Sequence, residues 1–158
     1  MRECFWNSDG FRDTEKHLLV IEVIREQKLD FFAISETGRS NFTAPFLRKL
    51  SGGFDYHWYC LPPQGRSGGM LVGINSTTLH VNNVSHGDRC VKFKLRSKND
   101  GFEWALVPVY GAAQDEHKHE FLAELARTCN NETLPMLVDG DFNIIRRKEE
   151  KNNDNFDS

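Results

Sequence analysis

The chain has 158 residues, of which 39% are hydrophobic and 27% are charged, and its formal net charge is −3. These values are ordinary for one globular domain with a real core, and no apolar stretch approaches the ~18 residues of a membrane span. The charge does not mark a nucleic-acid binder, nor does it exclude one, because phosphate contact needs only local positive patches.

Four cysteines, at positions 4, 60, 90 and 129, lie far apart and form no CxxC pair. Strand pattern begins within three residues of Met1, which leaves no room for a signal peptide. We therefore expect reduced, mostly buried thiols rather than disulfides or a zinc site. The expected location is intracellular, either nuclear or cytoplasmic, and not secreted. The sequence gives no indication of the oligomeric state.

The first half of the chain alternates strand and helix patterns. The first helix offers Leu18, Leu19, Ile21 and Ile24 to the core, and Asp13 or Thr14 is its expected cap. Gly52 and Gly53 end the second helix. In chain order we predict a strand at 3–6, a helix at 14–28, a strand at 29–35, a helix at 44–50, and strands at 56–61 and 68–74.

The second half begins with strands alone. We predict strands at 78–84, 90–96 and 102–110, the last opened by an Asp-Gly turn. A helix then covers 114–129, with Phe121, Leu122, Leu125 and Ala126 on its apolar face. A last buried strand, which includes the apolar residues 134–138, leads to Asp141. Beyond it the chain turns polar, and residues 146–155 show no core pattern.

The end of this last strand carries the most informative polar pair. Asp141 and Asn143 lie two residues apart in the sequence Gly-Asp-Phe-Asn. If the chain is still extended there, both side chains share one face and can point at one ligand. A carboxylate beside an amide suits a general base with an orienting donor.

Polar residues also end several other predicted strands. They are Asn7 and Asp9 after the first strand, Glu36 after the second, and Tyr110 at the end of the strand at 102–110. Strands that pair in parallel would bring these carboxyl ends to one edge of a sheet. Carboxylate and amide oxygens suit Mg²⁺, or Mn²⁺, rather than zinc.

Each of these features also has a plainer interpretation. Asp141 and Asn143 can be turn formers after a strand, and Glu36 can lie in a solvated loop. Residues 7–10 alone make a good turn, and Tyr110 can be a core aromatic with its hydroxyl at the rim. It is their coincidence at strand ends that favours a functional site.

Five short blocks, in this order, resemble the endonuclease/exonuclease/phosphatase superfamily, which is DNase I-like. They are Trp-Asn-Ser-Asp-Gly at 6–10, Ser-Glu-Thr at 35–37, Ser-Gly-Gly-Met-Leu at 67–71, Val-Tyr-Gly at 109–111 and Gly-Asp-Phe-Asn at 140–143. Within that superfamily the chain most resembles the endonuclease domains of plant LINE-type retrotransposons. The fold implied is α+β, a four-layer αββα sandwich that is incomplete in its C-terminal part. Residues 1–145 would form the partial domain, and 146–158 a polar tail.

The resemblance implies a role for each matching residue. Glu36 would be the main metal ligand, assisted by Asp9 and by Asn7 near the metal and phosphate. Asp141 would align or deprotonate the attacking water. Asn143 would hold the phosphate and that acid, and Tyr110 would contact the phosphate. The implied activity is Mg²⁺-dependent cleavage of a phosphodiester, with DNA as the substrate and nicking as the reaction.

One departure from the superfamily pattern bears on activity. Members complete the site with an Asp-His pair near the C-terminus, and no histidine follows His119 in this chain. We therefore expect a truncated member that is inactive or impaired. The alternative is a non-catalytic retroelement remnant that at most binds nucleic acid or a protein. RNA deadenylases, inositol phosphatases and sphingomyelinases share the same blocks, so the substrate is less secure than the reaction type.

Overall fold

The computed structural model of the chain describes residues 1–62, 68–87, 90–110 and 115–141, and the side chains of all these except 110, 115–117 and 141. The chain forms two compact units. The first contains Met1–Val81 and Arg96–Phe102, and the second contains Asn82–Leu95 and Glu103–Ser158. Each unit is an α+β structure with helix beside sheet, as the sequence predicts.

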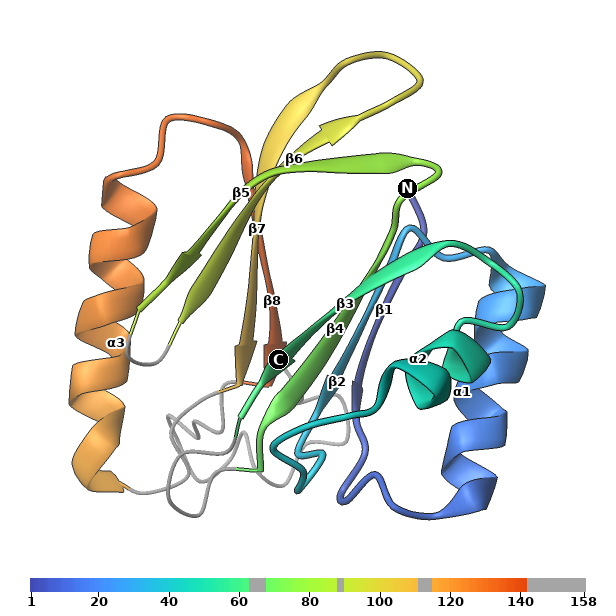
Figure 1. The fold of residues 1–158 in the computed structure, drawn as a ribbon. Coiled ribbons are helices and arrows are strands. Elements are labelled where there is room, and N and C mark those ends of the chain that lie inside the picture. Colours follow the sequence, from blue (N-terminus) through green and yellow to red (C-terminus); the bar gives the residue numbers. More distant parts are fainter. Residues whose placement is uncertain (63–67, 88–89, 111–114, 142–158) are drawn as a thin grey trace, which may run out of the picture. The chain divides into compact units, whose positions relative to one another are not determined.

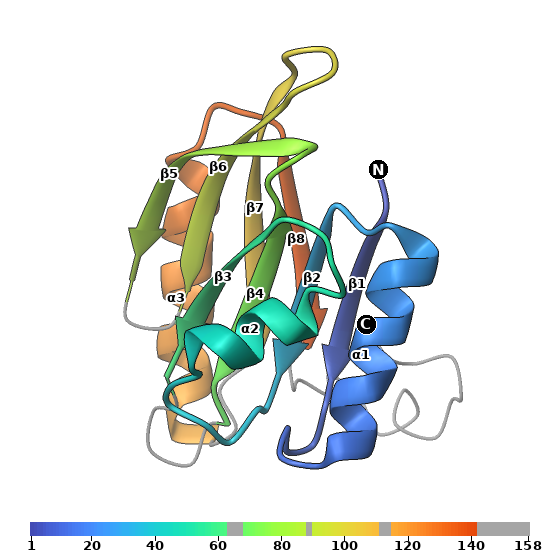
Figure 2. The same ribbon diagram turned by 45° about the vertical axis from the view of Figure 1, so that its right-hand side comes forward.

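The first unit is built on a four-stranded sheet. Its strands are β1 (Glu3–Asn7), β2 (Phe31–Ser35), β3 (Tyr56–Leu61) and β4 (Met70–Asn75), in the order β1-β2-β4-β3 (Figure 1). β1 and β2 are parallel, and β4 is antiparallel to both of its neighbours. Helices α1 (Thr14–Gln27) and α2 (Ala44–Leu50) lie on the same side of this sheet (Figure 2). The parallel pair follows from α1, which carries the chain back to the start of β2.

Local sequence sets the ends of both helices. Lys28 caps the C-terminus of α1: it adopts the left-handed conformation and donates its N–H to the carbonyl of Ile24. α2 begins after Thr43, whose hydroxyl accepts the N–H of Phe46 at 3.3 Å. Gly52 follows with a φ of 63°, so the predicted glycine break is confirmed.

The core of the first unit lies between its sheet and its helices. Val20 and Ile24 of α1 are buried in one cluster with residues of β2, α2, β3 and β4. The predicted core face of α1 is partly wrong, because Leu18 and Leu19 are 54% and 48% exposed. The helical repeat accounts for their exposure. Val20 and Ile24, four residues apart, share the face that meets the sheet, and the two leucines lie beside that face.

The second sheet contains β5 (Leu79–His86), β6 (Val91–Ser97), β7 (Glu103–Tyr110) and β8 (Met136–Asp141), in that order. β7 and β8 are parallel and are connected by α3 (Asp115–Asn130). Phe121 of α3 is buried against Val107 and Val109 of β7. Leu122 is 45% exposed and Ala126 is exposed as well, so the predicted place of these two residues on the packed face is wrong. Phe121 and Leu125, one turn apart, form the packed face instead.

A buried carboxylate holds β6 to the loop before β8. The Glu132 side chain is 3% exposed, and its Oε1 lies 2.7 Å from Lys92 Nζ. Its other oxygen accepts the backbone N–H groups of Thr133 and Leu134 at 3.0 and 2.9 Å. The bond from Lys92 and the N–H of Leu134 lower the pKa of Glu132 from 4.5 to about 2.

Replacing Glu132 with glutamine is expected to cost about 1–3 kcal/mol of unfolding free energy at pH 7. Because the folded pKa is depressed, this contribution is present above pH 4.5 and is lost as the pH falls toward 2. Urea unfolding of both proteins at several pH values measures it. The gap between Glu132→Gln and the natural chain should narrow below pH 4.5. A gap that stays constant down to pH 3 contradicts this assignment.

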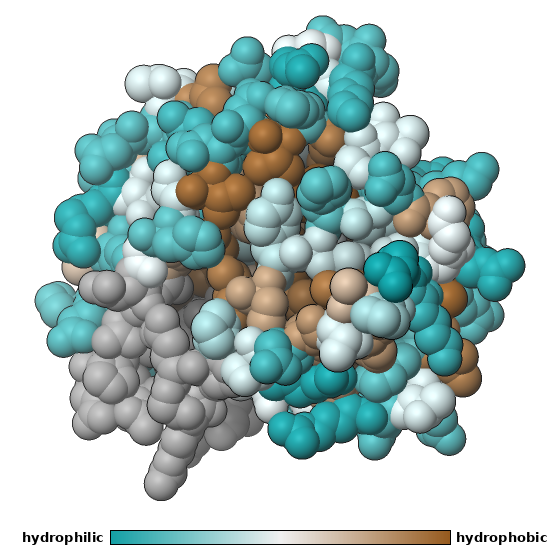
Figure 3. Space-filling view, in the orientation of Figure 1, coloured by the Kyte–Doolittle hydropathy of each residue, from teal (hydrophilic) through white to brown (hydrophobic). Residues whose placement is uncertain are grey.

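The surface carries some exposed apolar side chains. Figure 3 shows hydrophilic residues over much of the visible face, with hydrophobic residues exposed between them.

All four cysteines are free thiols, and only Cys90 is buried, so the prediction of mostly buried thiols holds for one of them. Burial and Glu124 raise the pKa of the Cys90 thiol to about 12, which makes it unreactive at neutral pH. Among the described helices, none is long and apolar enough to cross a bilayer.

Candidate functional site

The carboxyl ends of β1 and β2 lie side by side in the first unit. Asn7, the last residue of β1, is the register partner of Ser35, the last residue of β2. Asp9 and Glu36 follow within two residues. Three of the six predicted site residues therefore lie at one edge of one sheet, as expected for parallel strands.

Hydrogen bonds continue from one loop to the next beyond the ends of these strands. The loop after β1 donates to the loop after β2, which in turn donates to the segment before β4. The bonds are Ser8 N–H to Ser35 O at 3.0 Å, Gly10 to Glu36 at 2.7 Å, Phe11 to Thr37 at 3.0 Å, Thr37 to Gly69 at 3.3 Å and Gly38 to Gly68 at 2.5 Å. Three chain segments are thus fixed together around the predicted ligands.

Two of the predicted ligands have an unusual backbone conformation. Asp9 and Glu36 have φ values of 50° and 53°, in the left-handed region that side chains with a Cβ disfavour. Lys28 is the other non-glycine residue in that region within the described chain. Such strain persists where the surrounding structure imposes it, and it gathers at functional sites. Here the inter-loop hydrogen bonds impose it.

Gly68 makes this arrangement possible by its lack of a side chain. A Cβ placed on it would lie 2.6 Å from the Cα of Glu36 and 3.0 Å from its Cβ. The 2.6 Å contact is closer than real Cβ atoms make, and the Glu36 backbone cannot swing away as a side chain could. The close approach of the two loops therefore requires glycine at position 68.

Asn7 and Asp9, which are exposed, and Glu36, which is half-buried, present side-chain oxygens at this edge. Asn7 Oδ1 accepts the N–H of Asp9 at 3.0 Å, which turns the chain after β1. The carboxylates of Asp9 and Glu36 make no hydrogen bond or ion pair to the residues that the structure describes. In that part of the chain no three Asp, Glu, His or Cys side chains gather in the manner of a metal centre. Two carboxylates and an amide nevertheless fit a hard divalent cation, which prefers oxygen ligands and accepts further ones from water or substrate.

The second unit ends two strands on predicted site residues in the same way. Tyr110 and Asp141 are register partners at the carboxyl ends of the parallel strands β7 and β8. Gly140 precedes Asp141 with a φ of 139°. The predicted partner Asn143 lies outside the described residues. Parallel pairing is therefore present in each sheet, but the prediction that all these strand ends meet at one edge of one sheet is wrong, because the structure divides them between two sheets.

Sequence reasoning missed the groups that support this edge. Ser8, 2% exposed, donates its hydroxyl to the carbonyl of Ser35 at 2.9 Å. Thr37 is fully buried, and its hydroxyl donates to the carbonyl of Gly68 at 3.3 Å. Both partners are distant in sequence, so no local pattern could have identified these roles.

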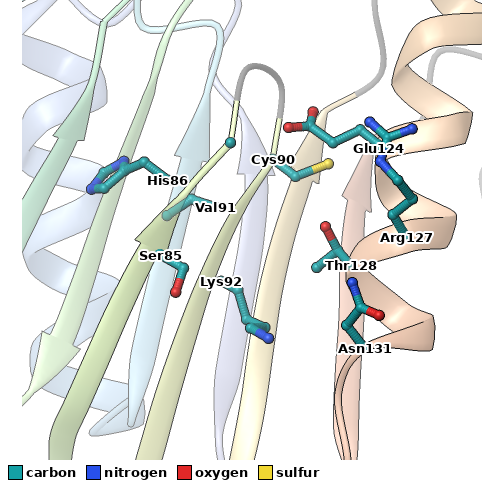
Figure 4. A pocket seen from close by; sticks show the side chains of 10 residues that line it. Ser85, His86, Cys90, Val91, Lys92, Glu124, Arg127, Thr128 and Asn131 are labelled. Atoms are coloured by element: carbon teal, nitrogen blue, oxygen red, sulfur yellow. The ribbon is translucent and has the colours of Figure 1, made fainter.

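A hollow of about 330 Å³ lies in the second unit between β5, β6 and α3 (Figure 4). Lys92, Glu124 and Arg127 are among the residues that line it. Lys92 is already bound to Glu132, and Glu124 lies against Gly87 and contacts the Cys90 thiol. Lys92 and Glu124 therefore already have partners within the second unit.

Comparison with known proteins identifies the family of this fold. The sequence model of the Endonuclease/Exonuclease/phosphatase family matches residues 4–155. No curated protein sequence matches the chain at a significant level.

Solved structures share the fold at low sequence identity. The human Nocturnin catalytic domain with bound sulfate is 16% identical, with a TM-score of 0.64 over 91% of this chain and 64% of that one. D. rerio TDP2 with a single-strand DNA product is 12% identical, with a TM-score of 0.66 over 94% and 62%. The mannosyl-6-phosphatase of Bacteroides thetaiotaomicron is 11% identical, with a TM-score of 0.63 over 91% and 66%. The chain spans about two thirds of the length of these proteins, and the predicted DNase I-like α+β fold is confirmed.

Proposed function

This chain belongs to the endonuclease/exonuclease/phosphatase family, and from that premise we propose that it acts as a divalent-metal-dependent phosphodiester hydrolase on nucleic acid. One observation carries the proposal. In the first unit Asn7, Asp9 and Glu36 share one sheet edge, and inter-loop hydrogen bonds hold Asp9 and Glu36 there in the disfavoured left-handed conformation. Oxygen donors fixed in this way suit metal binding.

Each residue has a chemical role in the proposal. Glu36 would be the principal metal ligand, with Asp9 and Asn7 beside it. Asp141 would orient or deprotonate the attacking water, a contribution typically worth about 10²–10⁴ in rate. Asn143 would hold the phosphate and Asp141, and Tyr110 would donate its hydroxyl to a phosphate oxygen. The paired ends of β7 and β8 support the joint role of Tyr110 and Asp141.

The metal we propose is Mg²⁺, with Mn²⁺ as a substitute. When bound, such an ion supplies positive charge for the phosphate oxygens that become more negative during hydrolysis. The protein's part is to present hard oxygen ligands at a fixed edge, and to position water and phosphate with the other side chains.

We propose DNA as the substrate and nicking as the reaction. The sequence blocks that resemble LINE-type retrotransposon endonucleases support this choice. The single-strand DNA product bound to TDP2, which has a similar fold, supports a nucleic-acid substrate. Residues 144–158 contain no histidine to match the Asp-His pair, so we expect residues 1–158 assayed alone to turn over slowly.

A plasmid-nicking assay with Mg²⁺ tests this function. The natural chain should convert supercoiled plasmid to the open circle slowly, and Asp141→Ala should remove that conversion. Asp13→Ala is the matched control, since Asp13 is exposed and its side chain makes no capping bond to α1. EDTA should abolish nicking by the natural chain. Equal background in the natural chain and Asp141→Ala rules out catalysis by these residues and leaves the non-catalytic alternative.

A further inference from the structure

Lys16 lies in the first turn of α1 and reaches back to the loop that carries Asp9. Its ammonium nitrogen is 2.7 Å from the carbonyl oxygen of Ser8, 3.0 Å from that of Gly10 and 3.2 Å from that of Asp9. An ammonium group has three N–H donors, so these three carbonyls use all of them. The side chain is half-buried, and no acidic group pairs with it among the residues that the structure describes.

The three carbonyls belong to consecutive residues, and this constrains the loop strongly. Consecutive carbonyls point in one direction only if the chain curls around a common centre. The chain curls here because Asp9 adopts a left-handed φ of 50° and Gly10 a φ of 94°. The left-handed form is less favourable for aspartate than the right-handed one, because its Cβ crowds the following carbonyl oxygen. Bonds to a charged donor are about twice as strong as neutral ones and can offset that cost.

We propose that Lys16 is a positioning residue for metal binding. It holds the carbonyls of residues 8–10 inward, and this orients the Asp9 carboxylate outward at the edge where Glu36 lies. The inference rests on the proposed metal function and adds to it a residue that touches neither metal nor substrate. A lysine that merely anchored α1 would contribute to stability and leave metal affinity unchanged.

Manganese affinity, measured by the EPR signal of free Mn²⁺, tests this role without any catalytic assay. Lys16→Ala is expected to weaken Mn²⁺ binding about 10–100-fold, the range typical of residues that orient metal ligands. Lys49→Ala is the matched control, because Lys49 is exposed in the last turn of α2 and should leave affinity unchanged.

Chemical rescue sharpens the test. Lys16→Ala lacks the propylammonium portion of the side chain, so added propylammonium should restore Mn²⁺ affinity, while propanol of the same shape should not. Lys16→Arg is a second variant, which keeps the positive charge and a long side chain at this position. Its charge sits on a planar group that cannot direct three donors from one nitrogen, so we expect a loss between those of the natural chain and Lys16→Ala.

Two results would overturn the inference, and they are distinguishable. If Lys16→Ala and Lys16→Arg lower the melting temperature but bind Mn²⁺ within twofold of the natural chain, Lys16 is only a structural anchor and the metal function stands. If the natural chain itself binds no Mn²⁺, the proposed metal function fails and takes this inference with it.

Discussion

Replacing Glu36 with glycine is expected to abolish metal binding and at the same time to stabilise the fold. Glu36 adopts a φ of 53° that glycine adopts without strain. Relief of that strain stabilises the folded state, while the extra entropy of glycine stabilises the unfolded chain by a smaller amount. The net effect should raise the unfolding free energy by about 1 kcal/mol. A residue whose removal improves stability is retained for function rather than for folding.

Metal affinity and stability are measured on the same samples. Glu36→Gly and Glu36→Gln should each weaken Mn²⁺ binding by more than about 100-fold, since both remove a charged ligand. Only Glu36→Gly should gain stability in urea, because glutamine keeps the Cβ and the strain. Glu26→Gln, an exposed site in the last turns of α1, is the matched control and should change neither quantity. Normal Mn²⁺ binding by Glu36→Gln would exclude Glu36 as a ligand.

Replacing Gly68 with alanine is expected to damage stability and metal binding together. The new Cβ would lie 2.6 Å from the Glu36 Cα, so the loop after β2 or the segment before β4 must shift. Forcing an extra carbon into such a contact typically costs about 1–3 kcal/mol. The shift falls on the backbone of the proposed ligand, so we expect Mn²⁺ affinity to fall at least about 10-fold.

Gly73→Ala separates this effect from general destabilisation. A Cβ at Gly73 would lie 2.5 Å from the ring of Trp58, which packs over β4 and donates its indole N–H to Ser51. This variant should lose a similar amount of stability, measured by urea unfolding, yet bind Mn²⁺ normally. Equal affinity losses in Gly68→Ala and Gly73→Ala would mean that metal binding reports stability alone.

Much of the secondary structure could be predicted from the sequence because it depends on short-range patterns. The apolar run Phe31–Ser35 is a strand buried on both faces, and the Asp-Gly turn does join β6 to β7. The buried face of each helix was harder to predict. Leu18, Leu19 and Leu122 carry the same apolar signal as the residues that are buried, and which side of a helix meets a sheet depends on packing partners elsewhere in the chain.

By itself the sequence determined the succession of helices and strands along the chain and the oxygen-bearing residues that follow several of the strands. Those features are written in a few adjacent positions, so Asn7, Asp9 and Glu36 could be named as candidates without coordinates. Only the tertiary structure decided that Asp9 and Glu36 are left-handed, that Lys16 holds three carbonyls, and that Gly68 must lack a side chain. These features arise where separate chain segments meet, and the energy that fixes them comes from hydrogen bonds and close contacts between residues that no local pattern relates.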